Sequence, residues 1–173
     1  LYVLQEQEPK AFTAIERTIQ SIAPYFKRFN LAHSKLSPDQ ISLVWEEQNS
    51  DMYLDAQSLS DGTLRFIALA TLLLQPEPPK TIVIDEPELG LHPAAIEKLS
   101  GLVRVASQRG AQVLIATQSS SLVSCFEPED ILVVERQDGS TVFSRPDKER
   151  LASWLEDYSL GELWEKNLIG GKP

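Results

Sequence analysis

Apolar residues recur at the spacing of a helix in two stretches of the sequence. The first stripe lies between about Pro9 and Phe29, and Pro24 is placed to end that helix or to start a new turn. Its members are Phe12, Ile15, Ile19 and Ile22. The second stripe follows Pro93, a residue favoured at the first position of a helix, and Gly110 stands where a C-terminal cap belongs. Its members are Ile96, Leu99, Leu102, Val103 and Ala106.

Two continuous apolar runs flank the second helix and predict strands. They are Thr81 to Ile84 and Val113 to Ala116. A run without polar alternation is typical of a strand that is buried on both faces of a parallel sheet. Strand, helix and strand at these lengths form a βαβ unit. The sequence therefore predicts an α/β fold with a largely parallel sheet and flanking helices.

The remaining pattern predicts a pair of short strands, a hairpin and closing helices. Ile41 to Glu47 and Met52 to Ala56 are expected to be short strands laid against a larger sheet. Ile131 to Glu135 and Thr141 to Ser144 flank Asp138-Gly139, a strong hairpin turn signal. One or two helices should close the chain, with apolar residues at Leu151, Trp154, Leu155, Leu160, Leu163 and Trp164.

One further helix, from Thr63 to Leu74, is apolar almost all round and must therefore be buried. Ser60 is well placed as its N-cap. A helix N-terminus presents free backbone N–H groups and positive dipole character, which suit a phosphate. Gly62 permits close backbone approach there, and the Ser60 hydroxyl can donate a hydrogen bond. A plain N-cap explains the same residues when they are taken alone.

Composition and charge argue against two kinds of role, direct DNA binding by this segment and membrane insertion. The chain has 173 residues, enough for one domain with a core, and a formal net charge of −9. That charge repels a nucleic-acid backbone, so this segment is not expected to be a main DNA contact. The single cysteine, Cys125, fits a reducing cytosol and a small buried side chain. No apolar run approaches the ~20 residues of a membrane span, so we expect a cytoplasmic protein without membrane contact.

The strand from Thr81 runs straight into a row of acidic residues, Asp85, Glu86, Pro87 and Glu88. Ligands of parallel α/β sheets gather at the carboxyl ends of the strands. A carboxylate in the position of Asp85 can hold Mg²⁺, directly or through water. The adjacent Glu86 can orient or deprotonate an attacking water. Ordinary loop acids after a strand explain this stretch equally well on its own.

Taken together, these segments resemble the C-terminal half of an ABC-type ATPase head of the SMC- and RecF-like AAA family. Leu-Ser-Asp-Gly-Thr-Leu-Arg at 59–65 resembles the ABC signature motif, and Thr-Ile-Val-Ile-Asp-Glu-Pro-Glu at 81–88 resembles Walker B. Gly-Leu-His-Pro at 90–93 stands at the D-loop position, and Ala-Thr-Gln-Ser at 116–119 at the switch position. Ser-Leu-Gly-Glu-Leu-Trp at 159–164 is similar to the end of stand-alone AAA-type ABC ATPases.

The resemblance implies ATP and Mg²⁺ as cofactors. Asp85 would serve the Mg²⁺ site, Glu86 would polarise the attacking water, and Gln118 would stand at the switch position. The signature segment, with Ser60, Asp61 and Gly62, would contact the γ-phosphate of a nucleotide held mainly by a second copy.

The resemblance leaves two further residues open. His92 would shape the D-loop that crosses the dimer interface, and a structural turn histidine is the alternative. Arg65 would face nucleotide or DNA, or would be a solvated first-turn arginine.

Two departures from the family pattern affect the expected activity. No Gly-x-x-x-x-Gly-Lys-Ser/Thr sequence occurs in these residues, so the loop that cradles the phosphates is missing. In this family it lies in an N-terminal half that would precede Leu1, so these residues alone should bind and hydrolyse ATP poorly. Gln118 stands where the family usually has histidine. Glutamine donates a hydrogen bond but shares no proton, so hydrolysis should be slow or gated by a partner.

The predicted organisation has three parts. Residues 1–35 would end a helical or arm segment, residues 36–146 would form the C-terminal lobe of the ATPase domain, and residues 147–173 would form a helical tail. We expect an ATPase that dimerises around ATP in DNA repair, chromosome maintenance or phage defence, with any DNA bound by other parts of the protein. The alternative is a non-hydrolysing ABC-like module that docks a nuclease or toxin partner. The nucleotide-binding subunit of a membrane transporter fits the motifs less well.

Overall fold

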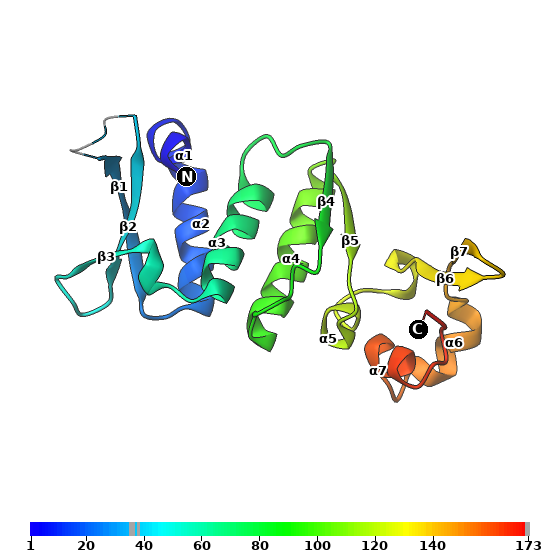
Figure 1. Cartoon of the computed structure of the whole chain (residues 1–173). Helices are drawn as coiled ribbons and strands as arrows, with labels where there is room; N and C mark the ends of the chain where they lie inside the picture. Colours follow the sequence, from blue (N-terminus) through cyan, green and yellow to red (C-terminus); the bar gives the residue numbers. More distant parts are fainter. Residues whose placement is uncertain (35–36, 38, 172–173) are drawn as a thin grey trace. The chain divides into compact units, whose positions relative to one another are not determined.

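The chain divides into two compact units, Leu1–Ile115 and Ala116–Pro173. The computed structural model describes residues 1–34, 37 and 39–171 (Figure 1). The boundary that the sequence predicts at 35/36 lies outside the described residues. The three-part division into 1–35, 36–146 and 147–173 stays a prediction, and each compact unit is described by itself below.

The first unit begins with two helices and an antiparallel sheet. The helices are α1 (Tyr2–Gln7) and α2 (Pro9–Ile22), and the strands are β1 (Phe26–His33), β2 (Ile41–Glu47) and β3 (Tyr53–Asp55), in the order β1-β2-β3. The helix predicted from Pro9 is confirmed, and it ends at Ile22, just before the Pro24 that the sequence places at its end. Phe26, Phe29 and Leu31 are buried between more exposed residues of a strand that the sequence reading missed.

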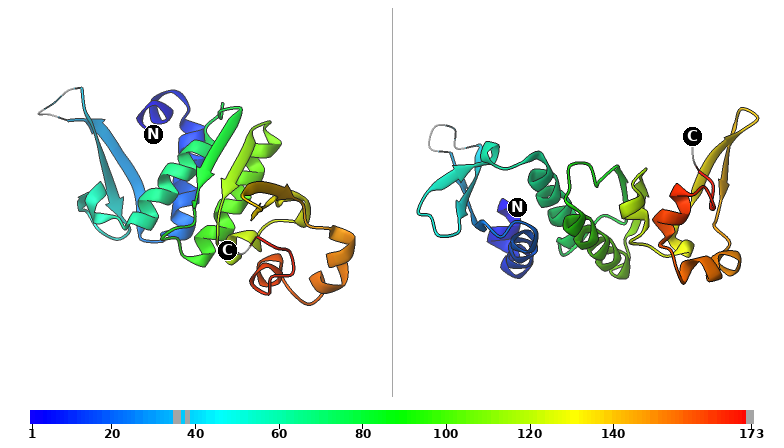
Figure 2. Two further views of the ribbon diagram at one scale, coloured as in Figure 1. Left: turned by 45° about the vertical axis from the view of Figure 1, so that its right-hand side comes forward. Right: turned by 90° about the horizontal axis from the view of Figure 1, so that it is seen from below.

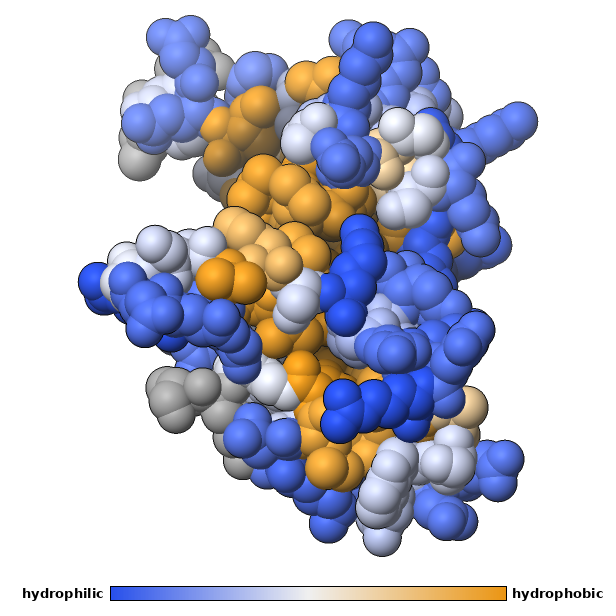
Figure 3. Space-filling view, turned by 90° about the vertical axis from the view of Figure 1, so that its right-hand side faces the viewer, coloured by the Kyte–Doolittle hydropathy of each residue, from blue (hydrophilic) through white to orange (hydrophobic). Residues whose placement is uncertain are grey.

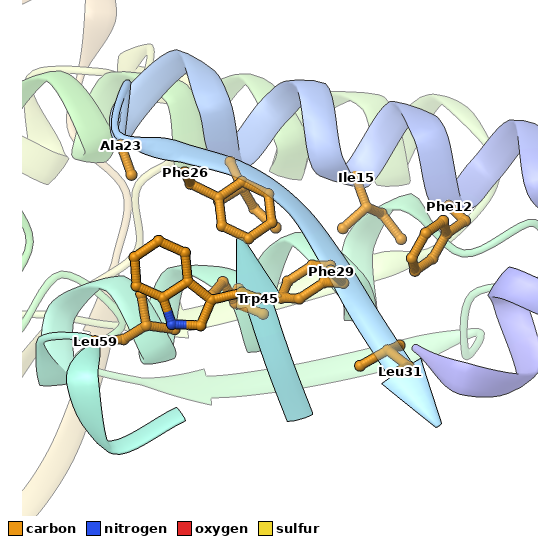
Figure 4. Packing of buried hydrophobic residues seen from close by; sticks show 10 residues of the cluster. Phe12, Ile15, Ala23, Phe26, Phe29, Leu31, Trp45 and Leu59 are labelled. Atoms are coloured by element: carbon orange, nitrogen blue, oxygen red, sulfur yellow. The ribbon is translucent and has the colours of Figure 1, made fainter. Parts of the chain in front are cut away.

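Packing between α2 and this sheet, rich in aromatic rings, forms one hydrophobic cluster of the first unit (Figure 4). The Phe26 ring lies 4.7 Å from the Phe29 ring and 6.0 Å from the Trp45 ring, measured between centroids. The indole N–H of Trp45 donates to the backbone carbonyl of Asp55 and to the Ser58 hydroxyl, at 3.1 and 3.0 Å. Ser58 belongs to a 3-10 turn, Ala56–Ser58. This buried donor therefore ties the sheet to the segment that leads into the next helix.

A βαβ arrangement completes the first unit. Helix α3 (Asp61–Leu74) is followed by β4 (Thr81–Asp85), α4 (Pro93–Gln108) and β5 (Gln112–Ala116). Helices α2, α3 and α4 lie in a row in which neighbours pack against each other (Figure 2). Strands β4 and β5 are hydrogen-bonded neighbours in a parallel pair. The predicted helices, strands and α/β fold class are confirmed.

The sheet of β4 and β5 is covered on one face. Ile82 is buried, whereas the alternate side chains Val83 and Leu114 are 74% and 50% exposed. The expectation that these two strands are buried on both faces was therefore wrong for the described residues. The described elements cover only one face of the β4–β5 sheet. Apolar residues also reach the surface elsewhere, and Figure 3 shows one face of the molecule on which they gather.

The second unit is small and built around its own apolar cluster. Its elements are α5 (Ser120–Val123), a 3-10 turn (Pro128–Asp130), β6 (Val133–Gln137), β7 (Ser140–Ser144), α6 (Lys148–Leu155) and α7 (Leu160–Glu165). Val123, Leu151, Leu160 and Leu163 form its core. The predicted hairpin is confirmed, and its turn residues Asp138 and Gly139 both have positive φ, 50° and 82°. The predicted closing helices are confirmed as α6 and α7.

Candidate functional site

The N-terminus of α3 carries the segment that resembles the ABC signature. The Ser60 hydroxyl accepts a hydrogen bond from the Thr63 backbone N–H at 3.1 Å, which is the N-cap geometry that the sequence predicts. Ser60 and Asp61 are exposed, whereas Gly62 and Thr63 are buried. The Ser60 hydroxyl and Asp61 therefore lie at the surface of a helix N-terminus, the kind of position where an anion can bind.

The backbone of this helix end touches the loop that follows β4. A methyl group built on Gly62 would lie 2.1 Å from the carbonyl oxygen of Gly90, which leaves no room for a side chain. Gly90 itself has φ of +76°, a conformation that favours glycine. The signature-like segment and the loop at 88–93 thus meet backbone to backbone within the first unit.

The two carboxylates that the sequence singles out stand at the carboxyl end of β4. Asp85 is the last residue of the strand and is exposed, and Glu86 is half-buried. Glu86 has φ of +41°, in the left-handed region that side chains rarely adopt. Its carbonyl oxygen accepts hydrogen bonds from the Arg65 guanidinium at 3.2 Å and from the Leu89 N–H at 3.3 Å. A strained backbone is therefore held from two sides next to a candidate catalytic group.

Arg65 was expected to face nucleotide or DNA, or solvent. In the structure its guanidinium donates to the Glu86 backbone, although the side chain remains exposed. No signal in the sequence links these two residues, because a main-chain carbonyl presents the same acceptor whatever the side chain.

The donor set at β4 suits Mg²⁺ better than a metal that needs several protein ligands. No group of three or more His, Cys, Asp or Glu side chains able to hold a metal is found among the residues that the structure describes. Mg²⁺ typically takes one or two carboxylates, and phosphate oxygens and waters complete its shell. The exposed carboxylate of Asp85 meets that requirement.

His92 occupies the turn before α4. Its Nδ1 accepts a hydrogen bond from the Ala94 N–H at 3.3 Å, so the ring caps the helix, and it is exposed. The alternative of a structural turn histidine describes this geometry. A part for His92 in a dimer interface stays a prediction.

Gln118 belongs to the second unit and follows β5 as an exposed residue. Its neighbours are fixed locally: Thr117 Oγ1 accepts from the Ser119 N–H at 3.0 Å, and the Ser119 hydroxyl caps α5. The structure describes the two units separately, so cooperation of Gln118 with Glu86 stays a prediction.

A hydroxyl contact at the helix end escaped sequence reasoning. The Tyr25 hydroxyl lies 3.1 Å from Thr63 Oγ1, which in turn lies 2.9 Å from Ser60 Oγ. Tyr25 and Thr63 are 38 positions apart in the sequence. Apolar periodicity predicts α2 and α3 but does not predict that a side chain in the turn after α2 reaches the start of α3.

Comparison with known proteins places these features in a family. A model of the family described as "AAA domain, putative AbiEii toxin, Type IV TA system" matches residues 3–124, well over half of the chain. The chain belongs to this AAA family. The match covers the signature-like segment, β4 with its carboxylates, and the residues after β5. The resemblance to ABC-type ATPases of the SMC- and RecF-like kind is confirmed.

Two curated relatives extend the comparison. The AAA chain is 30% identical over 127 residues to the Old nuclease of Escherichia phage P2, covering 67% of this chain and 22% of that protein. It is 24% identical over 167 residues to the phosphate import ATP-binding protein PstB 2 of Listeria monocytogenes, covering 91% of this chain and 59% of that protein. The chain thus spans about a fifth and about three fifths of these relatives.

Solved structures confirm the fold. An SMC ATPase, studied for ATP-driven dimerisation and DNA-stimulated activation, aligns with a TM-score of 0.59 and 18% identity, over 86% of this chain and 92% of that one. The Smc head of Pyrococcus furiosus, bound to the C-terminal domain of ScpA, aligns with a TM-score of 0.65 and 16% identity, over 90% of this chain and 39% of that one. None of the helices in the described part of the AAA chain is long and apolar enough to span a membrane.

Proposed function

We propose that this chain is the signature and Walker B part of an ATP-hydrolysing AAA protein of the SMC- and RecF-like kind, two copies of which close around ATP. One observation carries the proposal. The signature-like segment at Ser60 and Gly62 and the carboxylates at Asp85 and Glu86 belong to one unit and touch through Gly90 and Arg65. A head of this kind needs both groups on the same rigid body, because each serves a different ATP of the dimer.

In the proposed dimer, the exposed end of α3 contacts the γ-phosphate of an ATP that the other copy holds. The Ser60 hydroxyl and the free backbone N–H groups donate to its oxygens, and the buried Gly62 keeps the helix end free of side-chain bulk. Asp85 holds Mg²⁺, which when bound neutralises developing phosphate charge. Glu86 orients the attacking water and accepts its proton.

The loop that cradles the phosphates comes, in this proposal, from outside the 173 residues, since these contain no Gly-x-x-x-x-Gly-Lys-Ser/Thr sequence. Gln118 donates a hydrogen bond toward the γ-phosphate but cannot relay a proton. We therefore propose slow hydrolysis, or hydrolysis that a partner accelerates.

The wider role that we propose is DNA repair, chromosome maintenance or phage defence in the cytoplasm. An SMC ATPase studied for DNA-stimulated activation and a phage nuclease are among the proteins to which this chain is similar. The net charge of −9 favours DNA contacts made elsewhere in the protein.

A second candidate is a non-hydrolysing module that docks a nuclease or toxin partner. Gln118 in place of the usual histidine favours it, and so do the similarity to the Old nuclease and the toxin in the family's description. The retained pair Asp85 and Glu86 favours hydrolysis.

The proposal is tested by ATP-driven association of the protein that joins this chain to its phosphate-binding loop. In a Glu86→Gln background, which should retain bound ATP, sedimentation should show a dimer with ATP and Mg²⁺ and a monomer without them. Ser60→Arg should abolish the dimer by filling the anion site. Ser21→Arg, at an exposed serine of α2, is the matched control and should leave it intact. A Ser60→Arg protein that dimerises as tightly as its parent contradicts the proposal.

A further inference from the structure

Three hydroxyl groups form a hydrogen-bonded chain that ends at the tip of α3. Tyr25 Oη lies 3.1 Å from Thr63 Oγ1, and Thr63 Oγ1 lies 2.9 Å from Ser60 Oγ. Ser60 Oγ also accepts from the Thr63 backbone N–H at 3.1 Å. Tyr25 lies between α2 and β1, whereas Ser60 and Thr63 lie at the start of α3, so the contact joins the turn before β1 to the signature-like segment.

The three hydroxyl groups have a preferred order of donation, from Tyr25 to Thr63 and from Thr63 to Ser60. A phenol is more acidic than an aliphatic alcohol, which makes Tyr25 the better donor and Thr63 the acceptor. Thr63 can then donate to Ser60, whose two lone pairs are taken up by the hydroxyl and the backbone N–H of Thr63. The proton of Ser60 is left to point outward, where an anion at the helix end attracts it. Hydrogen bonds in such a series polarise one another in the same direction.

Neighbouring residues hold the side chains of Tyr25 and Thr63 in place. Thr63 is 8% exposed. The Tyr25 ring packs on Trp45 with 5.8 Å between ring centroids, and the Tyr25 backbone carbonyl accepts from the Gln48 N–H at 2.7 Å. The orientation of the Ser60 hydroxyl therefore depends on Tyr25, which contacts β2 and the residue after it, and not on the signature-like segment alone.

We infer that Tyr25 and Thr63 are positioning residues that turn the Ser60 hydroxyl into a dedicated donor to a phosphate oxygen. The inference rests on the proposed function, in which that oxygen belongs to the γ-phosphate of an ATP held by a second copy. Tyr25 touches no nucleotide in this account and acts through Thr63.

The test is a double-mutant cycle on ATP-driven dimerisation, in the Glu86→Gln background of the protein with its phosphate-binding loop. Tyr25→Phe removes one hydroxyl, and Ser60→Ala removes the final donor. Tyr25→Phe should weaken the dimer by about 3- to 10-fold, the loss expected for one neutral hydrogen bond. In the Ser60→Ala background, Tyr25→Phe should not weaken the dimer further. Thr63→Val should resemble Tyr25→Phe, and Thr63→Ser should restore dimerisation.

Tyr53→Phe is the control, because it removes a hydroxyl from the same sheet at a 60% exposed ring. It should leave the dimer unchanged, and the thermal unfolding midpoints of all variants without ATP should show that each is folded. Equal losses from Tyr25→Phe with and without the Ser60 hydroxyl, or no loss at all, overturn the inference while the proposed function stands. A parent that does not dimerise with ATP overturns both.

Discussion

Gly62 meets the carbonyl oxygen of Gly90 at a distance that admits no added carbon. Because the obstructing atom is backbone, relief requires the loop or the helix end to shift. Gly62→Ala should therefore destabilise the protein by about 1–3 kcal/mol, the range for overpacked sites. Gly101→Ala, inside α4 with nothing within 4 Å, is the matched control and should stabilise by about 0.5–1 kcal/mol. Urea unfolding measures both, and equal effects of the two substitutions would contradict this account of the contact.

Glu86 combines a left-handed backbone with a candidate catalytic carboxylate. An L-residue in that region costs about 1–2 kcal/mol relative to its ordinary conformation, and glycine does not. Glu86→Gly should consequently be more stable to unfolding than Glu86→Ala by about 1 kcal/mol, although both lose the carboxylate. Thermal denaturation of the pair checks this, and an Ala variant as stable as the Gly variant argues against strain at this position.

At the scale of elements, β1 and β2 are joined by a charge cluster. Glu46 is 5% exposed and accepts from Arg28 Nε at 2.8 Å, and Lys27 Nζ lies 3.1 Å from its other carboxylate oxygen. The hydrogen bond from Arg28, with help from Lys27, lowers the pKa of Glu46 from its ordinary 4.5. A lowered folded-state pKa contributes stability that is present above pH 4.5 and is lost as the pH falls through the folded-state value.

Glu46→Gln should remove this part of the acid dependence of unfolding. The wild-type free energy of unfolding should fall more steeply than that of the variant as the pH drops below 4.5. Glu16→Gln is the contrasting control, because burial raises the pKa of Glu16 and its contribution has the opposite sign. Denaturant titrations between pH 3 and pH 7 separate the two. Parallel pH profiles for wild type and Glu46→Gln would show that the cluster does not act as described.

The elements that the sequence predicted best are those with local signals. Pro93 and Gly110 bracket α4, and Asp138-Gly139 set the β6–β7 turn, because their backbone preferences do not depend on distant residues. Strand β1 was missed because no turn signal in the sequence marks it, and pairing with β2 decides its conformation. The contacts of Tyr25 with Thr63 and of Arg65 with Glu86 depend on how helix ends meet, which periodicity does not encode.

For the molecule as a whole, the apolar pattern of β4 and β5 predicts more burial than the described elements provide. The runs in β4 and β5 are apolar on both faces, yet Val83 and Leu114 stand 74% and 50% exposed. An exposed apolar sheet face favours association, so these 173 residues alone should self-associate at high concentration.

The variant Val83→Thr with Leu114→Thr keeps strand propensity and should reduce that association. Val3→Thr, at a 60% exposed valine in α1, is the control and should not. Sedimentation over a range of concentrations measures the effect. A wild-type chain that stays monomeric at high concentration would contradict the expectation.

The central proposal is that Glu86 activates the attacking water in an ATP-hydrolysing protein. The most direct test is phosphate release from ATP and Mg²⁺ by the protein that joins this chain to its phosphate-binding loop, beside its Glu86→Gln variant. The account predicts turnover by the parent, and a variant that binds ATP but hydrolyses it about 10²- to 10⁴-fold more slowly, the range for loss of a general base. A parent without turnover under any DNA or partner condition, or a variant as fast as its parent, would contradict the account and favour a docking module.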